Sequence, residues 1–522
     1  MSAPFSAADW NALNCARPDG PAPITATRLA VMVSSFWYRP NFVIGSSGSV
    51  MLPAIIPICQ RRVSCEEGKF RAARMKRSVF GGIHGHDELQ LCPSTRGFQC
   101  PAPAVRWHAG RRQHWIPGPL SGQVESWGLP GLHGCRIWED WLNRTGGLLI
   151  NGRRYPIKIV EFDCGYDAGR AAEGARLLIE RHDVKLLMTL GGDTLAEIRD
   201  YLSQRKVLTS TLLPSDLSPD TPYLIAPSEL HPIFNVTGVE WLAQARPELR
   251  TVAICSQTDA LGLPSLATYR AAFKAAKLSV AKEIQYDPDT TDAAAIVEAM
   301  LDSNPDILCW CTSYTPMVHA MTEYAHEQGF KGQIISCTLD YYDQLVARTS
   351  VEFMEGFVFQ FPDFDDEKLN DKTFFFNQPK GFFDEYNSRF PGTWTAVSWE
   401  YVAILDIWHA AVEKSNSVNP ASVLAAMKQL GHVTHAFGPA HWWGESMFGI
   451  DNALVGDWPV VTLKNGKAKI AAFGSIPRWL KRHGGLLKQE MSDLGQLWDQ
   501  RLRASGNGTA LQARTPESIL QK

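Results

Sequence analysis

The sequence predicts an α/β protein of two lobes, each a mostly parallel sheet flanked by helices. From residue 115 onward, short apolar runs alternate with segments of helical spacing, which is typical of parallel sheets covered by helices on both faces. This pattern continues for about 320–360 residues, more than one hydrophobic core of about 250–300 residues holds. A change of composition at Phe353–Phe383, where aromatic and acidic residues mix, indicates a chain crossing between lobes and a loop.

The first elements of this pattern are the clearest. Tyr155–Phe162 alternates around β-branched residues as a strand does, and Ala168–Arg181 has apolar residues at helical spacing. Val184–Leu190 is a continuous apolar run that ends in two glycines, and a helix is expected at Leu195–Ser203. The next strands and helices are expected at Val207–Leu212, Phe234–Ala245, Thr251–Ser256, Leu266–Lys277, Ile307–Cys311, Met317–Gln328 and Gln333–Cys337. In such sheets ligands bind outside the carboxyl ends of the strands.

Helices dominate the later part of the chain. Thr395–Glu413 has the spacing of a long helix, and Pro420–Leu430 is expected to be another, with Asn419 as its cap and proline at its first position. A further helix is expected at Leu487–Leu502, followed by a polar tail.

Residues 1–114 differ from the rest of the chain. They hold 14 basic and six acidic residues, a net charge of +8 that leaves −11 for the remaining residues, and five of the eleven cysteines. No period of 2 or 3.6 runs through them. We expect a poorly structured or non-native extension, either a genuine basic segment or the product of a wrong start or a shifted reading frame, and set it apart from the fold. No secretion signal can be read at Met1.

Composition excludes several classes of protein. A content of 10% aromatic residues with 17 tryptophans excludes a mostly disordered chain, and a net charge of −3 gives no sign of nucleic-acid binding. No run of about 18 apolar residues predicts a spanning helix.

Motifs of catalysis and cofactor binding are missing from the sequence. There is no Gly-x-Gly-x-x-Gly after a strand, no phosphate loop, no Gly-x-Ser-x-Gly elbow and no His-Glu-x-x-His, so we expect no enzyme, no cofactor and no metal. Cys309 and Cys311 are interpreted as a buried pair of small apolar residues. His432, His435 and His441 are interpreted as scattered surface histidines rather than a ligand set.

The order of short motifs from Ile116 to about residue 473 resembles the type I periplasmic solute-binding proteins, in particular the leucine/isoleucine/valine-binding family of ABC importers. The motifs that carry the resemblance are Gly118-Pro119-Leu120-Ser121-Gly122, Gly131-x-x-Gly134, Asn143-Arg144-Thr145-Gly146-Gly147, Gly152-Arg153, Asp163, Gly329-Phe330, Met354-Glu355-Gly356, Phe437-Gly438-Pro439 and Asn465-Gly466-Lys467. No motif is specific alone, but their order and spacing together are.

The resemblance implies a periplasmic-binding-protein type I fold that closes on a small solute around a hinge of crossing strands. It assigns residues 115–228 and 355–437 to lobe one, residues 229–354 and 438–475 to lobe two, and leaves 476–522 as a C-terminal helix and tail. The ligand contacts that it implies are Trp127, Gly192, Asp193, Thr194, Leu213, Ser215, Leu261, Tyr314, Thr338 and Asp340.

Several of these residues have a ligand-binding role implied by the resemblance and, for some, a structural role as the alternative. Trp127 would cover the ligand or plug the hinge cleft. Gly192-Asp193-Thr194 and Ser215 would hold a ligand carboxylate, although Thr194 with Glu197 also fits a capping box at a helix start. Tyr314 lies just past the end of a strand, where a cleft residue is expected.

Two departures from the family bear on the identity of the ligand. Thr338 stands where the family commonly has an acid that pairs with a ligand amino group. Thr338 cannot supply this negative charge, and Asp340, two residues later, is the candidate to supply it instead. Asp193 would repel a ligand carboxylate. Aromatic residues at Trp127, Trp310, Tyr314 and Trp399 would suit an aromatic or amphipathic solute.

The function that follows is capture of a small amino-acid-like or aromatic carboxylate solute for the membrane permease of an ABC importer, in the periplasm. The alternative is a soluble ligand-sensing regulatory protein of the same fold. Both readings predict a small-molecule ligand.

Overall fold

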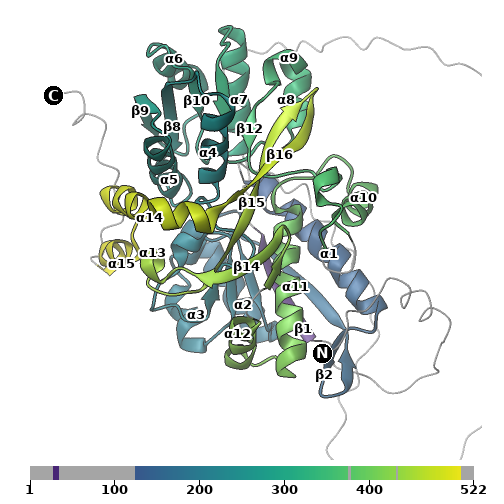
Figure 1. The fold of residues 1–522 in the computed structure, drawn as a ribbon. Coiled ribbons are helices and arrows are strands. Elements are labelled where there is room, and N and C mark those ends of the chain that lie inside the picture. Colours follow the sequence, from purple (N-terminus) through teal and green to yellow (C-terminus); the bar gives the residue numbers. More distant parts are fainter. Residues whose placement is uncertain (1–26, 34–123, 374–377, 431–432, 507–522) are drawn as a thin grey trace, which may run out of the picture. The chain divides into compact units, whose positions relative to one another are not determined.

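The computed structural model describes residues 27–33, 124–373, 378–430 and 433–506. Two sheets dominate these residues (Figure 1). The first has the strand order β4-β1-β5-β6-β7, and the second has the order β13-β14-β15-β12-β11-β10-β8-β9, with β16 paired to β15. Helices pack against both sheets, so the predicted α/β fold with mostly parallel sheets is confirmed.

The first sheet and the elements around it form lobe one. The early elements are β1 (Thr27–Val33), η2 (Glu125–Trp127), α1 (Leu129–Arg144), β2 (Leu148–Ile150), β3 (Arg153–Tyr155), β4 (Ile157–Asp163), α2 (Ala168–His182), β5 (Leu187–Thr189), η3 (Gly192–Leu195), α3 (Arg199–Arg205), β6 (Thr209–Thr211), η4 (Pro214–Asp216) and β7 (Leu224–Ile225). The chain returns later with α10 (Pro379–Arg389), α11 (Val397–Ser415) and α12 (Pro420–Gln429). The return begins later than residue 355, where it was predicted, because η5 (Glu367–Leu369) still lies against lobe two, with the Lys368 ammonium donating to the carbonyls of Ile470 and Ala471. The Asn419 side chain caps α12 by accepting from the backbone N–H groups of Ala421 and Ser422, as predicted.

Lobe two is built on the second sheet. Its elements are α4 (Asn235–Ala245), β8 (Thr251–Gln257), α5 (Gly262–Ala275), β9 (Ser279–Tyr286), α6 (Ala293–Leu301), β10 (Ile307–Cys309), α7 (Thr315–Glu327), β11 (Gln333–Ile335), α8 (Tyr342–Arg348), α9 (Val351–Met354), β12 (Val358–Phe359) and β16 (Lys467–Ser475). Strands β9, β8, β10, β11 and β12 run parallel, and β15 (Ala453–Lys464) is antiparallel to β12.

The strand β1 corrects the prediction that residues 1–114 contribute nothing to the fold. Thr27–Val33 pairs with β4 along its full length, and its Ala30 and Val31 pair with β5, so this strand lies inside the sheet of lobe one. No sequence period signals this strand, because a run of seven residues is too short to stand out in an arginine-rich sequence. The rest of that segment lies outside the described residues.

Three chain crossings join the lobes in the described residues up to β15, and β15 itself forms one of them. Its first residues pair with β14 (Gly438–Trp443), which also pairs with β13 (Val433–His435), and its later residues pair with β12 and β16 (Figure 1). Asn452, just before β15, donates its side-chain amide to the carbonyls of Pro222 and Leu224 in lobe one. Residues 438–452 therefore contact lobe one, although the sequence assigned them to lobe two.

Aromatic side chains fill the hinge where the crossings meet. The Phe234 ring stacks on that of Trp458 at 5.0 Å between centroids, and Trp458 Nε1 donates to the carbonyl of Gln360 at 2.9 Å. Trp399 packs edge-on against Phe437 at 5.1 Å. These tryptophans form the core of the hinge, because all three crossings contribute to the cluster.

Two glycines explain why α1 and α11 pack so closely. A methyl group on Gly134 would lie 2.1 Å from the carbonyl oxygen of Ser398, and one on Gly131 would lie 2.2 Å from the ring of Tyr401. Only glycine fits at such distances. The Gly131-x-x-Gly134 motif thus has a packing role in this fold.

The C-terminal segment contains two helices instead of the single helix predicted at Leu487–Leu502. They are α14 (Ile476–Asp493) and α15 (Trp498–Gly506), separated near Gly495, whose φ of +70° ends the first helix. Glu490 of α14 is buried and pairs with Lys274 of α5, whereas Arg501 of α15 donates to the carbonyl of Ser215 in lobe one. The segment therefore contacts both lobes.

Cys309 and Cys311 are fully buried, and the described cysteines are free thiols, in line with their interpretation as small apolar residues. His432 lies outside the described residues, and of the His435 side chain nothing is described. No group of three or more potential metal ligands occurs in the part of the chain that the structure describes. Within that part, no helix has the length and apolar character needed to cross a membrane.

Candidate functional site

Loops at the carboxyl ends of the strands bring most of the predicted ligand residues to the boundary between the lobes. Trp127 of lobe one and Tyr314 of lobe two face each other there, with ring centroids 6.0 Å apart and planes at 60°. The hydroxyls of Ser126 and Thr315 share a hydrogen bond of 2.8 Å next to them. The two lobes are thus in direct contact at this place.

The loop after β5 supplies the lobe-one side. Gly191 and Gly192 have φ of +102° and +63°, a conformation that favours glycine, and a methyl group on Gly192 would lie 3.2 Å from the Leu213 side chain. The Gly192 N–H donates to Asp216 Oδ2 at 2.9 Å. The structure therefore brings the Gly192 and Leu213 loops together, as the resemblance implied.

Thr194 does not form the predicted capping box with Glu197. Its hydroxyl donates to the carbonyl of Gly191 at 2.8 Å and lies 3.3 Å from that of Thr189, so it is used inside its own loop. The following helix α3 starts at Arg199, with Ile198 at its N-cap position. The two glycines bend the chain so tightly that a short 3-10 turn takes the place of the helix start.

The loop after β8 supplies the lobe-two side, and Asp259 organises it. Its Oδ1 accepts from the backbone N–H groups of Leu261 and Gly262 at the start of α5, at 3.1 and 2.7 Å. Its Oδ2 accepts from the side-chain amide of Gln257 at 2.6 Å and from the Tyr314 hydroxyl at 3.2 Å. Burial raises the pKa of Asp259 to about 6, and Asp193 across the boundary adds to the rise, while these hydrogen bonds limit it.

Asp340 joins the lobes, and we call its contacts with Trp127, Thr315 and Ala396 the Asp340 junction. Its Oδ2 accepts from Trp127 Nε1 at 2.7 Å and from the Thr315 hydroxyl at 3.2 Å, and its Oδ1 accepts from the Ala396 N–H at 3.1 Å. Burial raises the pKa of Asp340 to about 6, and the three hydrogen bonds oppose the rise. Asp340 is thus occupied by protein donors and does not face the boundary as a free charge for a ligand amino group.

The other predicted residues differ in their surroundings. Thr338 and Leu261 are buried, and the Thr338 side chain makes no hydrogen bond with another described residue. Ser215 is buried, and its hydroxyl also lacks a partner in the described chain. Asp193 is the only one of the ten predicted residues that is exposed. The boundary is therefore nearly closed.

Four residues of this boundary were missed by the sequence analysis: Tyr166, Asp216, Asp259 and Arg501. Tyr166, with φ of +59°, follows β4 in the sequence Cys-Gly-Tyr-Asp, and Asp259 follows β8, so their positions after strand ends were a usable signal. Asp216 is fully buried, and its Oδ1 lies 3.4 Å from Arg501 of α15. No sequence pattern relates Arg501 to Asp216, because 284 residues separate them.

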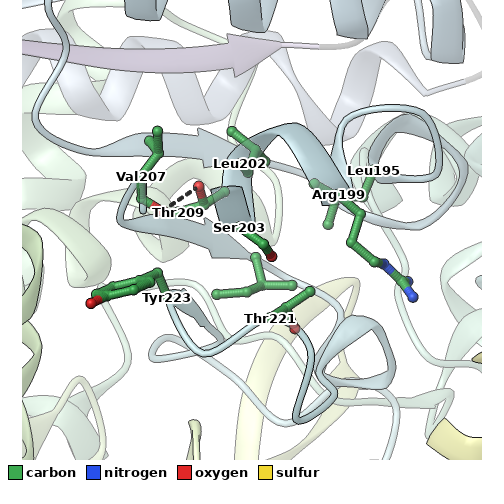
Figure 2. Close-up of a pocket in the computed structure, with 9 residues that line it drawn as sticks. Leu195, Arg199, Leu202, Ser203, Val207, Thr209, Thr221 and Tyr223 are labelled. Atoms are coloured by element: carbon green, nitrogen blue, oxygen red, sulfur yellow. Dashed lines mark hydrogen bonds between the residues drawn. The ribbon is translucent and has the colours of Figure 1, made fainter. Parts of the chain in front are cut away.

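A small apolar pocket in lobe one lies apart from this boundary. Figure 2 shows the side chains that line it, which come from α3, from Val207 and Thr209 beside and in the strand β6, and from Thr221 and Tyr223. Its volume of about 10 Å³ is no more than a water molecule needs. None of the ten predicted ligand residues lines it, so it is not the candidate site.

Two larger pockets flank the Asp340 junction. One of about 430 Å³ lies between Ser126 and the helices α7 and α8, and one of about 250 Å³ is lined by Asp340 and by aromatic residues such as Phe361 and Trp394. Members of the junction thus line both pockets, Thr315 the first and Asp340 with Ala396 the second.

A comparison with protein-family models matches residues 116–468 to the periplasmic binding protein model, about two-thirds of the chain. The chain belongs to the periplasmic binding protein family. A comparison with curated proteins found no match.

Solved structures of periplasmic binding proteins share the fold of this family member. The leucine-binding protein of Thermotoga maritima is 16% identical with a TM-score of 0.56, over 67% of this chain and 95% of that one. A solute-binding protein of an ABC transporter from Rhodopseudomonas palustris HaA2, solved with p-hydroxybenzoic acid, is 15% identical with a TM-score of 0.57, over 68% and 95%. The branched-chain amino-acid transporter substrate-binding protein of Streptococcus pneumoniae, solved with isoleucine, is 15% identical with a TM-score of 0.54, over 67% and 96%. The two-lobed type I fold is thereby established for this periplasmic binding protein.

Proposed function

We propose that the protein is the substrate-binding component of an ABC-type importer, which captures a small amino-acid-like or aromatic solute between its lobes and delivers it to a membrane permease. Membership of the periplasmic binding protein family is the observation that carries this proposal. The neighbours solved with p-hydroxybenzoic acid and with isoleucine support the two solute classes. We further propose that the protein acts in the periplasm and returns its solute unchanged.

The contacts across the lobe boundary support this mode of action. Trp127 and Tyr314 come from different lobes and their rings are 6.0 Å apart, so a solute entering between them requires the lobes to separate and then to close. All three crossings pass through one aromatic cluster, which is a suitable pivot for this hinge motion. Binding energy from contacts with both lobes would hold the closed form.

Thermal melting of the full chain tests the proposal, because a solute that binds only the folded state raises the melting temperature. The panel contains branched-chain amino acids, hydroxybenzoates, amides and sugars. A shift with one chemical class, with the solute recovered unchanged, supports a binding protein. A folded sample without a shift in any class contradicts it.

The variant Tyr314→Ala tests whether the solute binds at the lobe boundary. We expect it to weaken solute binding by about 1–3 kcal/mol while the fold is kept, because Tyr314 contributes a ring and a hydroxyl to the boundary. Tyr201→Ala is the matched control, since Tyr201 lies on α3 with an exposed contact to Glu180. Equal affinities of the two variants, measured by calorimetry, would remove Tyr314 from the site.

A further inference from the structure

Two acidic and two phenolic side chains lie on the loops where the two lobes approach each other. Tyr166 and Asp193 come from lobe one, and Asp259 and Tyr314 come from lobe two; we call these four residues the cleft mouth. A methyl group on Gly192 would lie 2.8 Å from the Tyr166 hydroxyl and 3.4 Å from the Cβ of Ala260, which places the loops of the two lobes against each other. Burial raises the pKa of the Tyr166 hydroxyl, and the negative charges of Asp259 and Asp193 add to the rise.

Several donors that could bind a ligand carboxylate in lobe one are already used, although the Ser215 hydroxyl is not. The Gly192 N–H and the Thr211 hydroxyl donate to Asp216 Oδ2, at 2.9 and 2.8 Å. The guanidinium of Arg501 lies 3.4 Å from the other oxygen of the same carboxylate. An internal carboxylate therefore occupies these donors, and the nearby cation is paired with it.

Two polar groups of the cleft mouth lack partners. The Tyr166 hydroxyl is buried, in a side chain only 6% exposed, and makes no hydrogen bond with the described residues. The Asp193 carboxylate likewise has no hydrogen bond or ion pair within the described ranges. A buried hydroxyl without a partner costs free energy, so a group supplied from outside the described chain would stabilise this arrangement.

The negative charges of Asp193 and Asp259 determine which kind of ligand group binds here. Partial desolvation and the charge of Asp216 raise the pKa of Asp193, although the side chain keeps contact with solvent, and Arg501, which is engaged with Asp216, acts in the opposite direction. A second carboxylate placed here would meet Asp193 and Asp259 and would be repelled. A positively charged group with N–H donors would be attracted by both acids and would donate to the Tyr166 hydroxyl.

We propose that the cleft mouth binds the cationic end of the solute, a protonated amine or an amidinium group, rather than a carboxylate. Asp193 supplies the direct ion pair, Tyr166 accepts a hydrogen bond, and Asp259 contributes its charge through the Tyr314 hydroxyl. This inference rests on the proposed function and narrows its solute to organic cations.

Matched pairs of solutes test the sign of the charge. Calorimetry on the full chain compares 4-hydroxybenzylamine with 4-hydroxybenzoate, and 2-methylbutylamine with 3-methylpentanoate. We expect the amine to bind at least about 10-fold more tightly than the acid in at least one pair, since a charge-assisted contact is worth about 1.5–3 kcal/mol. Tighter binding of the acids overturns the inference and leaves the binding function standing. Absence of binding in both pairs overturns the inference and also counts against the proposed function for these solutes.

Variants of the cleft mouth identify the residues responsible. Asp193→Asn is expected to weaken amine binding about 10-fold or more, and Tyr166→Phe about 3–10-fold, with little change in the affinity for any acid. Asp259→Asn keeps an acceptor for the start of α5, but it removes the charge and the second acceptor, which takes hydrogen bonds from Gln257 and from the Tyr314 hydroxyl. Asp302→Asn, at the exposed end of α6, is the control and is expected to bind as the parent does. An unchanged amine affinity in Asp193→Asn would falsify the assignment.

Discussion

The cleft mouth and the Asp340 junction use the same functional group in opposite ways. Asp340 accepts three hydrogen bonds from three separate segments of the chain and is almost fully buried. Asp193 is exposed, and its carboxylate makes no hydrogen bond or ion pair with another described residue. A carboxylate that protein donors already satisfy holds the lobes together, whereas one without donors is available to a solute. Asp340 is the acid nearest in sequence to Thr338, the position at which the resemblance implies an amine-binding acid. Its carboxylate is nevertheless occupied, whereas that of Asp193 is not.

The largest expected effect comes from removing the carboxyl group of the junction. Asp340→Ala leaves the Trp127 N–H, the Thr315 hydroxyl and the Ala396 N–H without their acceptor in a buried place, and we expect a loss of about 2–4 kcal/mol of unfolding free energy at pH 5. Urea denaturation measures it. A loss below about 1 kcal/mol would show that water replaces the carboxylate and that the junction does not stabilise the closed lobes.

The pH dependence of the unfolding free energy tests the protonation of Asp340 in the folded protein. Because burial raises the pKa of Asp340 to about 6 in the folded protein, the folded state holds this proton more tightly than the unfolded state does. The resulting stability is fully present below the unfolded pKa of about 3.9 and is lost as the pH rises through about 6, a loss of about 2–3 kcal/mol.

Comparison of the parent with Asp340→Asn isolates this contribution, since Asp259 also titrates near pH 6. The difference in unfolding free energy between the two proteins should change between pH 4 and pH 7 and be constant above. Parallel pH profiles would mean that Asp340 keeps an ordinary pKa.

A single donor of the junction has a smaller effect. Trp127→Phe keeps an aromatic ring near Tyr314 and removes the N–H that donates to Asp340 at 2.7 Å. We expect a loss of about 1–1.5 kcal/mol by urea denaturation. A Trp138→Phe variant is the control for tryptophan removal, because the buried Trp138 lies in α1 away from the junction.

The smallest effect on stability is expected in the cleft mouth. Asp193→Ala removes no hydrogen bond or ion pair of a described residue, so the unfolding free energy should stay within about 0.5 kcal/mol of the parent. A clear loss of stability in this variant would show that Asp193, like Asp340, stabilises the folded protein.

Local signals in the sequence were sufficient for the fold class and for the loops of the site. Apolar runs and helical spacing located most strands and helices. The family resemblance singled out the loops of Gly192 and Leu213, and the position just past a strand end added a second reason for Tyr314. These features depend on neighbouring residues, which a sequence displays directly.

Contacts between distant segments could not be predicted. The partners of Asp340 come from residues 127, 315 and 396, and the cation beside Asp216 comes from residue 501. Whether an acid is free or occupied depends on such partners, so the sequence alone does not distinguish Asp340, whose carboxylate is occupied, from Asp193. The lobe-one sheet is the same kind of case, since no local period shows that β1 pairs with β4.

The position of β1 has a consequence for biosynthesis. The ribosome makes this strand first, but its partners β4 and β5 emerge only after Ile157 and Leu187 have been translated. In lobe two, by contrast, β8 and β9 pair with a single helix between them. Long-range pairing of this kind is slow, and an unpaired strand exposes backbone groups to other chains. We therefore expect the nascent chain to depend on chaperones until β4 is complete, and lobe two to fold without waiting for lobe one.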